Sequence, residues 1–162
     1  RNMLNLIKKR NEDLYSIANG EVISITRVND KLFAKKLLGD GVAFLLYDGI
    51  IYSPCDAEVI MVAKTKHAIG LRTKNGNELL IHIGLDTVNL NGEGFSVFVK
   101  TGDKVKRGTK LVEVDLKFMN SKKIDLTTPM ILTDGDEYSL NILKSNQKVS
   151  LNDIVIKLER KQ

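Results

Sequence analysis

Short apolar runs recur along the chain from Gly20 onward, and turn-forming dipeptides separate them. The runs are rich in β-branched residues and occupy 22–26, 50–52, 59–62, 69–73, 79–83, 97–99, 111–114, 130–132 and 155–158. The turn signals between them are Asn19-Gly20, Asp40-Gly41, Asp48-Gly49, Asn75-Gly76, Asn91-Gly92 and Asp134-Gly135. Many short strands at this spacing are typical of an all-β antiparallel sandwich or barrel. Helix is expected only as short turns near 31–37 and 116–120.

Residues 1–18 follow a different pattern. Their apolar side chains fit one helical face and are Met3, Leu4, Ile7 and Leu14. Such a basic, amphipathic segment can touch a membrane surface at its periphery, but a chain end is more often a frayed tail. We therefore expect a tail or linker over 1–18 and a single domain over 19–162. The apolar stretches are far shorter than the ~20 residues that span a bilayer, so no membrane-spanning segment is expected.

Composition and charge narrow the classes of partner. The 162 residues include 25 Lys and Arg and 20 Asp and Glu, so the formal net charge is +5. Acidic residues are interleaved with the basic ones, aromatic residues make up 6% and Trp is absent, which argues against a nucleic-acid partner. The single cysteine, Cys55, is interpreted as a structural thiol in a turn. With no signal-peptide pattern near the start, a reducing, cytoplasmic location is expected.

The chain has two histidines, His67 and His82, on either side of the segment 74–77. The Asn-Gly pair in that segment predicts a β-hairpin with a two-residue type I′ turn. In that register His82 faces Ile69, so both imidazoles project from one face. The other residues expected on the histidine face are Leu71 and Leu80, and those expected on the core face are Ala68, Gly70, Leu79, Ile81 and Ile83. A slip of one residue would separate the imidazoles.

Two imidazoles on one face allow few reactions without further groups. A stable metal site needs at least three protein ligands, and the nearby candidates Cys55, Glu78 and Asp86 stand at no recognisable ligand spacing. A serine hydrolase would need a Gly-x-Ser-x-Gly motif, which the sequence lacks. Phosphoryl transfer needs one ring nitrogen that attacks and a second that donates a hydrogen bond to the phosphoryl oxygens. Spacing alone leaves open that both histidines are ordinary strand residues.

The segments around both histidines resemble the glucose-type enzyme IIA of the bacterial sugar phosphotransferase system. The most specific motif is Glu78-Leu79-Leu80-Ile81-His82-Ile83-Gly84-Leu85-Asp86-Thr87-Val88, which continues through 90–95. The segment Thr65-Lys66-His67-Ala68-Ile69 is similar to a second motif of that family. Further matches lie within 30–41, 53–57 and 102–108. The resemblance covers about residues 19–160 and implies a flattened antiparallel β-sandwich with a few short helical turns.

The resemblance implies a phosphohistidine carrier, a transferase component that acts only with partner proteins. Such a carrier accepts a phosphoryl group from the histidine phosphocarrier protein and passes it to a cysteine in the IIB domain of a sugar permease. By match, His82 is phosphorylated through Nε2, His67 stabilises the phosphoryl group, and Thr65 orients His67. The partner surface that the resemblance implies consists of an apolar rim and two acidic residues: Phe33, Leu38, Leu80, Val88, Asp30 and Asp86.

The resemblance implies no required cofactor, although His67 and His82 can hold Zn²⁺ if a partner supplies the remaining ligands. Some members of the family also bind and regulate other proteins, so a non-catalytic binding module remains an alternative. Residues 102–111 look like the hairpin of lipoyl- and biotin-carrying domains as well, but the Met-Lys-Met or Asp-Lys-Ala context of a modified lysine is absent. The sugar, and whether the chain stands alone or forms part of a permease, stay open.

Overall fold

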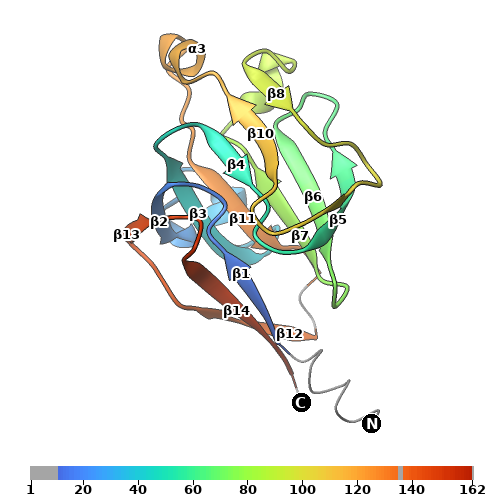
Figure 1. Cartoon of the computed structure of the whole chain (residues 1–162). Helices are drawn as coiled ribbons and strands as arrows, with labels where there is room; N and C mark the ends of the chain where they lie inside the picture. The colour runs from blue at the N-terminus through green and yellow to red at the C-terminus, as the bar shows by residue number, and fades with distance from the viewer. Residues whose placement is uncertain (1–10, 135–136, 162) are drawn as a thin grey trace.

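The structure, a computed structural model, describes residues 11–134 and 137–161 (Figure 1). Its first seven strands are β1 (Asn11–Tyr15), β2 (Gly20–Ser24), β3 (Asp40–Leu46), β4 (Ile50–Tyr52), β5 (Ala57–Val62), β6 (Ala68–Thr73) and β7 (Glu78–His82). The later strands are β8 (Phe95–Val97), β9 (Lys104–Val105), β10 (Lys110–Val114), β11 (Thr128–Leu132), β12 (Tyr138–Ile142), β13 (Gln147–Val149) and β14 (Ile154–Arg160). The helices are short and comprise α2 (Lys31–Ala34), α3 (Leu116–Ser121) and the 3-10 turns η1 (Ile25–Arg27) and η2 (Thr87–Leu90). Both predicted helical turns are therefore confirmed.

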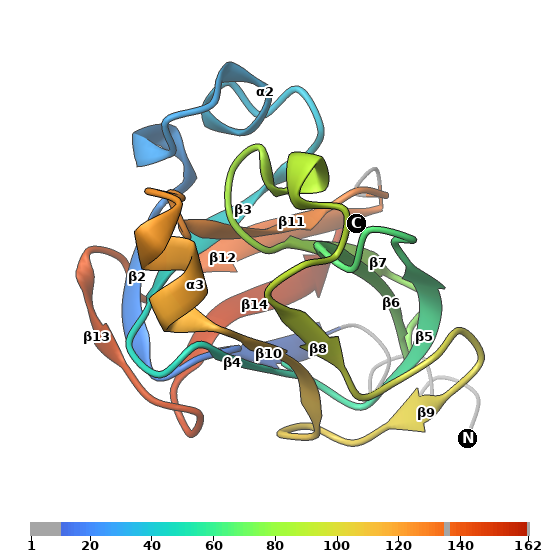
Figure 2. The ribbon, with the colours of Figure 1, turned by 90° about the horizontal axis from the view of Figure 1, so that it is seen from above.

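The strands form three antiparallel sheets. The largest has eight strands in the order β13-β2-β3-β11-β7-β6-β5-β9. Two sheets of three strands each have the orders β4-β10-β8 and β1-β14-β12. In Figure 2, β4, β10 and β8 lie on the opposite side of the molecule from β3, β11 and β7. The predicted all-β antiparallel sandwich is confirmed.

The hydrophobic core lies between the sheets and draws on all three of them. Strand side chains alternate between faces, so every second position of a strand such as β7 points into it. The largest side chains with almost no exposed surface are Phe44, Leu14, Ile17, Ile51, Ile69, Leu71, Leu79, Ile81, Ile83, Leu111, Met119 and Met130. A second, smaller cluster packs around the buried Phe33 of α2 and includes Ala43, Leu85 and Ile131. This second cluster places α2 beside the end of β7.

The N-terminal strand belongs to the folded domain. β1 pairs with β14 along its whole length. Leu14, Ile17 and Ala18 are almost completely buried. The predicted tail is therefore wrong for residues 11–18, because their apolar side chains complete the core through a partner strand far away in the sequence. Residues 1–10, with Met3, Leu4 and Ile7, lie outside the described residues. No helix among the residues that the structure describes is long and apolar enough to cross a membrane.

Candidate functional site

His82 ends strand β7 and His67 directly precedes strand β6, and the register of the β6–β7 hairpin differs from the predicted one. His82 pairs with Ala68, where the two-residue turn would pair it with Ile69. The turn has three residues, 74–76, and ends on Gly76, whose φ of +87° suits glycine. It is closed by hydrogen bonds from the backbone N–H groups of Thr73 to Asn77 and of Gly76 to Thr73. The predicted two-residue turn is therefore wrong by one residue.

The shift of one residue changes which side chains face the core. The buried face of the hairpin consists of Ile69, Leu71, Leu79, Ile81 and Ile83. Ala68, Gly70 and Leu80 lie on the opposite face together with His82. The prediction placed Ile69 and Leu71 on the histidine face and Ala68 and Gly70 on the core face. Both assignments are wrong, because the structure reverses them. A sequence signal for the correct register existed, because only this pairing puts all five large aliphatic residues on one side.

The two imidazoles nevertheless meet, by a route that strand alternation did not predict. The centroids of the His67 and His82 rings are 4.9 Å apart and the ring planes lie at 79°. His67 precedes the first residue of β6 and follows Lys66, whose φ is +65°. Its carbonyl oxygen accepts a hydrogen bond of 2.7 Å from the backbone N–H of Ile83. Because His67 stands outside the strand, its side chain does not follow the alternation and reaches the ring of His82.

The tautomer of His82 follows from its backbone partner. Nδ1 of His82 lies 2.8 Å from the carbonyl oxygen of Gly84. A carbonyl oxygen can only accept, so Nδ1 carries the proton and Nε2 keeps its lone pair. Gly84 has a φ of +78°, and a Cβ there would lie 2.6 Å from Cγ2 of Thr87. Only glycine fits this position comfortably, and no expectation from the sequence had singled it out.

His67 is oriented by a side chain instead. Oγ1 of Thr65 lies 2.7 Å from Nδ1 of His67. The hydroxyl can donate to this nitrogen, in which case the ring proton sits on Nε2. Thr65 therefore stands where the resemblance implies a residue that orients His67.

Both imidazoles are held in the neutral form at neutral pH. Burial lowers the pKa of His67, the neighbouring His82 lowers it further, and a hydrogen bond with the backbone of Thr65 partly offsets both effects. Burial also lowers the pKa of His82, against the opposing influence of the Gly84 carbonyl and of the carboxylates of Asp30 and Asp86. Burial disfavours a charged imidazolium. The site therefore offers two uncharged rings, one of them with a free Nε2 lone pair.

Phe33 does not lie on the exposed rim where it was expected. Its side chain is 3% exposed, and its ring centroid is 5.1 Å from that of His82 with the planes tilted by 56°. Phe33 is the buried residue of α2, a helix that starts where the side chain of Asp30 accepts a hydrogen bond from the N–H of Leu32. The ring of Phe33 thus packs against His82 and contributes to the burial that keeps the imidazole neutral.

The remaining rim residues differ in exposure. Leu38 and Val88 are exposed, whereas Leu80 is half-buried against the cluster beneath α2. Leu32 and Leu37 are exposed as well, with 50% and 65% of their surface free. These two leucines were missed, although their place beside Phe33 and Leu38 in the sequence was a signal. Leu32, Leu37 and Leu38 thus give α2 and the turn after it an exposed apolar surface, and α2 itself packs against His82 through Phe33.

Asp30 and Asp86 both lie near enough to His82 to raise its pKa. Asp30 is the N-cap residue of α2, so its carboxylate has a structural role in addition to any contact with a partner. Asp86 is exposed, and it precedes η2 with a φ of +57°. The two acidic residues that the resemblance implies are therefore brought to the same imidazole from two separate elements.

Within the described part of the chain, neither a metal-ligand cluster nor a reactive thiol is present. Within residues 11–134 and 137–161, no three His, Cys, Asp or Glu side chains converge as metal ligands. Zn²⁺ between His67 and His82 would therefore need ligands from another molecule. Burial, together with the nearby carboxylates of Glu12 and Asp56, raises the pKa of Cys55 to about 12. A thiol with such a pKa is a poor nucleophile at neutral pH, as expected for a structural cysteine.

Comparisons with known proteins point in one direction. Residues 12–138 match the family model described as "phosphoenolpyruvate-dependent sugar phosphotransferase system, EIIA 1". The glucose-specific EIIA component of Halalkalibacterium halodurans is 44% identical over 129 residues, which are 80% of this chain and 75% of that protein. The glucose-specific EIICBA component of Staphylococcus saprophyticus is 42% identical over 146 residues, 90% of this chain. The match spans only 21% of that longer protein.

A solved structure has the same fold. The glucose permease IIA from Mycoplasma capricolum superposes with a TM-score of 0.86 at 36% sequence identity. The superposition covers 91% of this chain and 96% of that one. At this identity and coverage, the likeness extends over about nine-tenths of the chain.

Proposed function

Because the chain belongs to the family of EIIA components of the phosphoenolpyruvate-dependent sugar phosphotransferase system, we propose that it carries a phosphoryl group on Nε2 of His82. The observation that carries the proposal is the 2.8 Å contact between Nδ1 of His82 and the carbonyl oxygen of Gly84. This contact leaves the lone pair on Nε2. A lowered pKa keeps that lone pair unprotonated at neutral pH.

In the proposed reaction, the Nε2 lone pair attacks the phosphorus atom of a phosphohistidine on a donor protein. The new N–P bond forms on His82 while the N–P bond of the donor breaks, and the donor imidazole leaves with the bonding electron pair. In the second step, the thiolate of an acceptor cysteine attacks the phosphorus and His82 leaves with its electron pair restored. No proton on His82 moves in either step, because Nδ1 keeps its hydrogen bond to Gly84.

His67 stabilises the charge that the phosphoryl oxygens carry during transfer. We assign to Thr65 the role of donor to Nδ1 of His67, since this leaves an N–H on Nε2 of that ring. With the ring centroids 4.9 Å apart, this N–H can reach oxygens of a group bound to His82. A preplaced donor at such a position stabilises the transition state more than the ground state.

The surroundings of the histidines suit protein partners. Exposed apolar side chains on a soluble protein mark interaction surfaces, and here they are Leu32, Leu37, Leu38 and Val88. The carboxylates of Asp30 and Asp86 add negative charge close to His82, which favours partners with basic residues. We infer that the histidine phosphocarrier protein and the IIB domain of a sugar permease dock here in turn. The EIICBA relative has a name that joins EIIA to further components.

Several further assignments follow from the proposed role and remain part of it. The carrier acts in the cytoplasm, needs no cofactor, and binds Zn²⁺ at His67 and His82 only where a partner completes the ligand set. Regulatory binding of other proteins would use the same exposed leucines around α2. A module that only binds would have no need for two neutral imidazoles in contact, so the geometry favours the carrier.

The test is transfer of labelled phosphate from phosphoenolpyruvate through the general phosphotransferase proteins. The wild-type chain should take up one phosphate in a bond that is stable in alkali and labile in acid. His82→Ala should take up none, because the attacking nitrogen is gone, while its thermal midpoint stays close to that of the wild type. Label on His82→Ala, or wild-type protein that takes up none, would overturn the proposal.

A further inference from the structure

A depression on the molecular surface lies at the far end of the β6–β7 hairpin from the histidines. It has a volume of about 310 Å³ and is formed by β5, β6 and β9. Strand residues rise about 3.3 Å each, so Arg72 at this depression lies roughly 17 Å along β6 from His67. The depression is therefore a separate place from the proposed phosphoryl site.

The sheet register explains how the depression arises. Ala57 pairs with Thr73 on one side and with Val105 on the other. The side chains of Thr73 and Val105 point into the core and are buried. The row of paired residues Thr73, Ala57 and Val105 therefore places no large side chain on the outer face of the sheet. The rows on either side point outward and carry charged residues. A small uncharged floor therefore lies between two charged walls.

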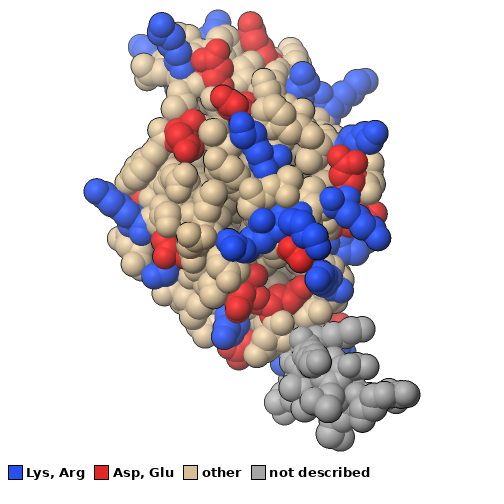
Figure 3. Space-filling view, viewed as in Figure 1, with Lys and Arg blue, Asp and Glu red and all other residues tan. Residues whose placement is uncertain are grey.

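Most of the charge around the depression is positive. The walls hold four basic and two acidic side chains, namely Arg72, Lys74, Lys104, Lys106, Asp56 and Glu58. Figure 3 shows Lys and Arg side chains gathered on this side of the molecule with fewer acidic ones among them. Arg72 also pairs with Glu78, whose Oε2 lies 3.2 Å from its guanidinium, so the local excess is one positive charge. A positive excess around a cavity of this size attracts a small anion.

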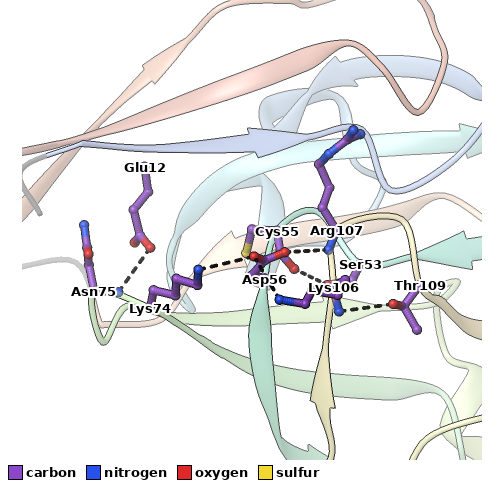
Figure 4. A network of polar contacts seen from close by, with 9 residues as sticks. All are labelled: Glu12, Ser53, Cys55, Asp56, Lys74, Asn75, Lys106, Arg107 and Thr109. Carbon is purple, nitrogen blue, oxygen red and sulfur yellow. Dashed lines mark hydrogen bonds and ion pairs between the residues drawn. The ribbon is translucent and has the colours of Figure 1, made fainter. Parts of the chain in front are cut away.

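Two of the lysines are already held in place by Asp56. Nζ of Lys74 and Nζ of Lys106 lie 3.4 Å and 3.9 Å from Oδ2 of Asp56, and the backbone N–H of Arg107 donates to its Oδ1 (Figure 4). These contacts lower the pKa of Asp56, so its carboxylate is ionised at neutral pH. On the opposite wall, Lys104 has no ion-pair partner within residues 11–134 and 137–161. One wall thus presents preorganised ammonium groups, and the other a free one.

We propose that this depression binds the phosphate monoester of a small metabolite. A monoester carries a charge of about −1.5 to −2 at neutral pH, so it is attracted by walls in which basic side chains outnumber acidic ones. Lysine ammonium groups and the Arg72 guanidinium are the usual protein partners of phosphate oxygens. The uncharged floor at Ala57 leaves room for a hydroxylated carbon skeleton. The proposal goes beyond the phosphocarrier role and uses neither histidine.

The test is a titration of the ¹⁵N-labelled whole chain, followed by the backbone amide signals. The probe is glucose 6-phosphate, and this choice alone rests on the proposed function, because a chain that serves sugar phosphorylation meets phosphorylated sugars. We expect saturable shifts at the amides of 56–58, 72–74 and 104–106, and none with glucose. Inorganic phosphate should shift the same signals with weaker affinity, since it lacks the carbon skeleton.

Three variants make the test specific. Lys104→Gln should weaken binding about threefold to tenfold, the effect of losing one charge-assisted hydrogen bond at an exposed site. Glu58→Gln should strengthen it by a similar factor, because it removes a repelling carboxylate from the same wall. Lys117→Gln on α3 changes the net charge equally, outside the depression, and should leave the affinity unchanged.

Four results would overturn the proposal. The first is that glucose 6-phosphate causes no shifts, and the second is that Lys104→Gln and Lys117→Gln weaken binding equally. The third is that the shifts are confined to the surroundings of His67 and His82. The fourth is that shifts appear only with polyglutamate. The last would show an acidic protein surface as the partner instead. His82→Ala should bind the probe as the wild type does, because the depression uses neither histidine. Loss of phosphorylation in this variant and loss of probe binding in Lys104→Gln therefore test the phosphocarrier role and this site separately.

Discussion

The two ends of the β6–β7 hairpin are built for different purposes. At the turn end, the carboxylate of Glu12 accepts hydrogen bonds from the Thr73 hydroxyl at 2.6 Å, from Nδ2 of Asn77 at 2.7 Å and from the backbone N–H of Asn75 at 3.2 Å. Figure 4 shows Glu12 reaching the turn from β1. At the histidine end, each imidazole has one hydrogen-bond partner for Nδ1. The turn end is held to β1 by three hydrogen bonds, whereas the histidine end leaves Nε2 of each ring available.

This difference shows how a small β-domain can hold two imidazole rings in contact while both stay partly exposed. The turn end and the core face of the hairpin fix where the strands lie. Asn77 is buried and donates a hydrogen bond to Glu12, and Ile81 is buried and pairs with Met130 of β11. The histidine end can then stay partly exposed and still keep its rings 4.9 Å apart. Changes at the two ends should therefore affect different properties, chemistry at one and stability at the other.

The largest expected effect is on chemistry at the histidine end. His67→Gln keeps an N–H donor near its original place, so the variant should still accept phosphate on His82. Transfer onward to the acceptor cysteine should slow by about 10²–10⁴-fold, the range typical of positioned catalytic groups. The measurement is the rate of label loss from the phosphorylated variant on mixing with a IIB domain. An unchanged rate would show that onward transfer does not need the imidazole ring of His67.

A smaller effect, on stability alone, is expected at the turn end. Glu12→Ala removes all three hydrogen bonds to the turn and leaves the buried side chain of Asn77 without this partner. The free energy of unfolding should fall by about 2–4 kcal/mol, measured by urea denaturation. The matched control is Asp13→Ala in the same strand, which loses a surface ion pair of 3.9 Å to Lys157 and should cost below about 1 kcal/mol.

The phosphorylation rate separates the two ends further. Glu12→Ala should be phosphorylated as fast as the wild type at a temperature where both are folded. A large loss of rate, with unfolding unchanged, would mean that the turn end controls the histidines and that the two ends are not separate in function.

The smallest expected effect concerns acid. Folding lowers the pKa of both histidines below the unfolded value of 6.5. The unfolded chain therefore binds more protons once the pH falls below that value, and stability must decrease. The contribution is complete above pH 6.5 and is lost as the pH falls through the folded pKa values. A double variant, His67→Gln with His82→Gln, should lose less stability between pH 7 and pH 5, measured by thermal unfolding. Equal losses would place the acid sensitivity elsewhere.

Local patterns predicted the elements because they act over a few residues. Alternating apolar positions marked β7, and turn dipeptides such as Asn91-Gly92 separated strands. The short helix α3 begins where the side chain of Asp115 accepts a hydrogen bond from the N–H of Phe118. The motif around His82 was specific enough to indicate the family, which the comparisons confirmed.

Contacts between distant segments decided what these patterns could not. The aliphatic pattern of the hairpin favours the turn of three residues, and the contacts that hold it come from Glu12 of β1 and from pairing of β7 with β11, both far away in the sequence. Whether residues 11–18 form a tail or a strand depends on β14, near the other end of the chain. Phe33 is buried only because α2 folds onto a cluster that includes Ile131. None of these partners can be read from the neighbours of the residue concerned.

The sequence by itself determined an antiparallel β-domain and its family, and it indicated His67 and His82 as the candidate pair for phosphoryl transfer. The tertiary structure decided that the rings meet, since His67 stands just before β6 and is turned toward His82 by the chain at Lys66. It also decided that both rings are neutral, because their pKa values depend on burial by the surrounding fold. Residue types and local periodicity are properties of short segments, whereas register, burial and the approach of two side chains are set by the lowest free energy of all strands packed together.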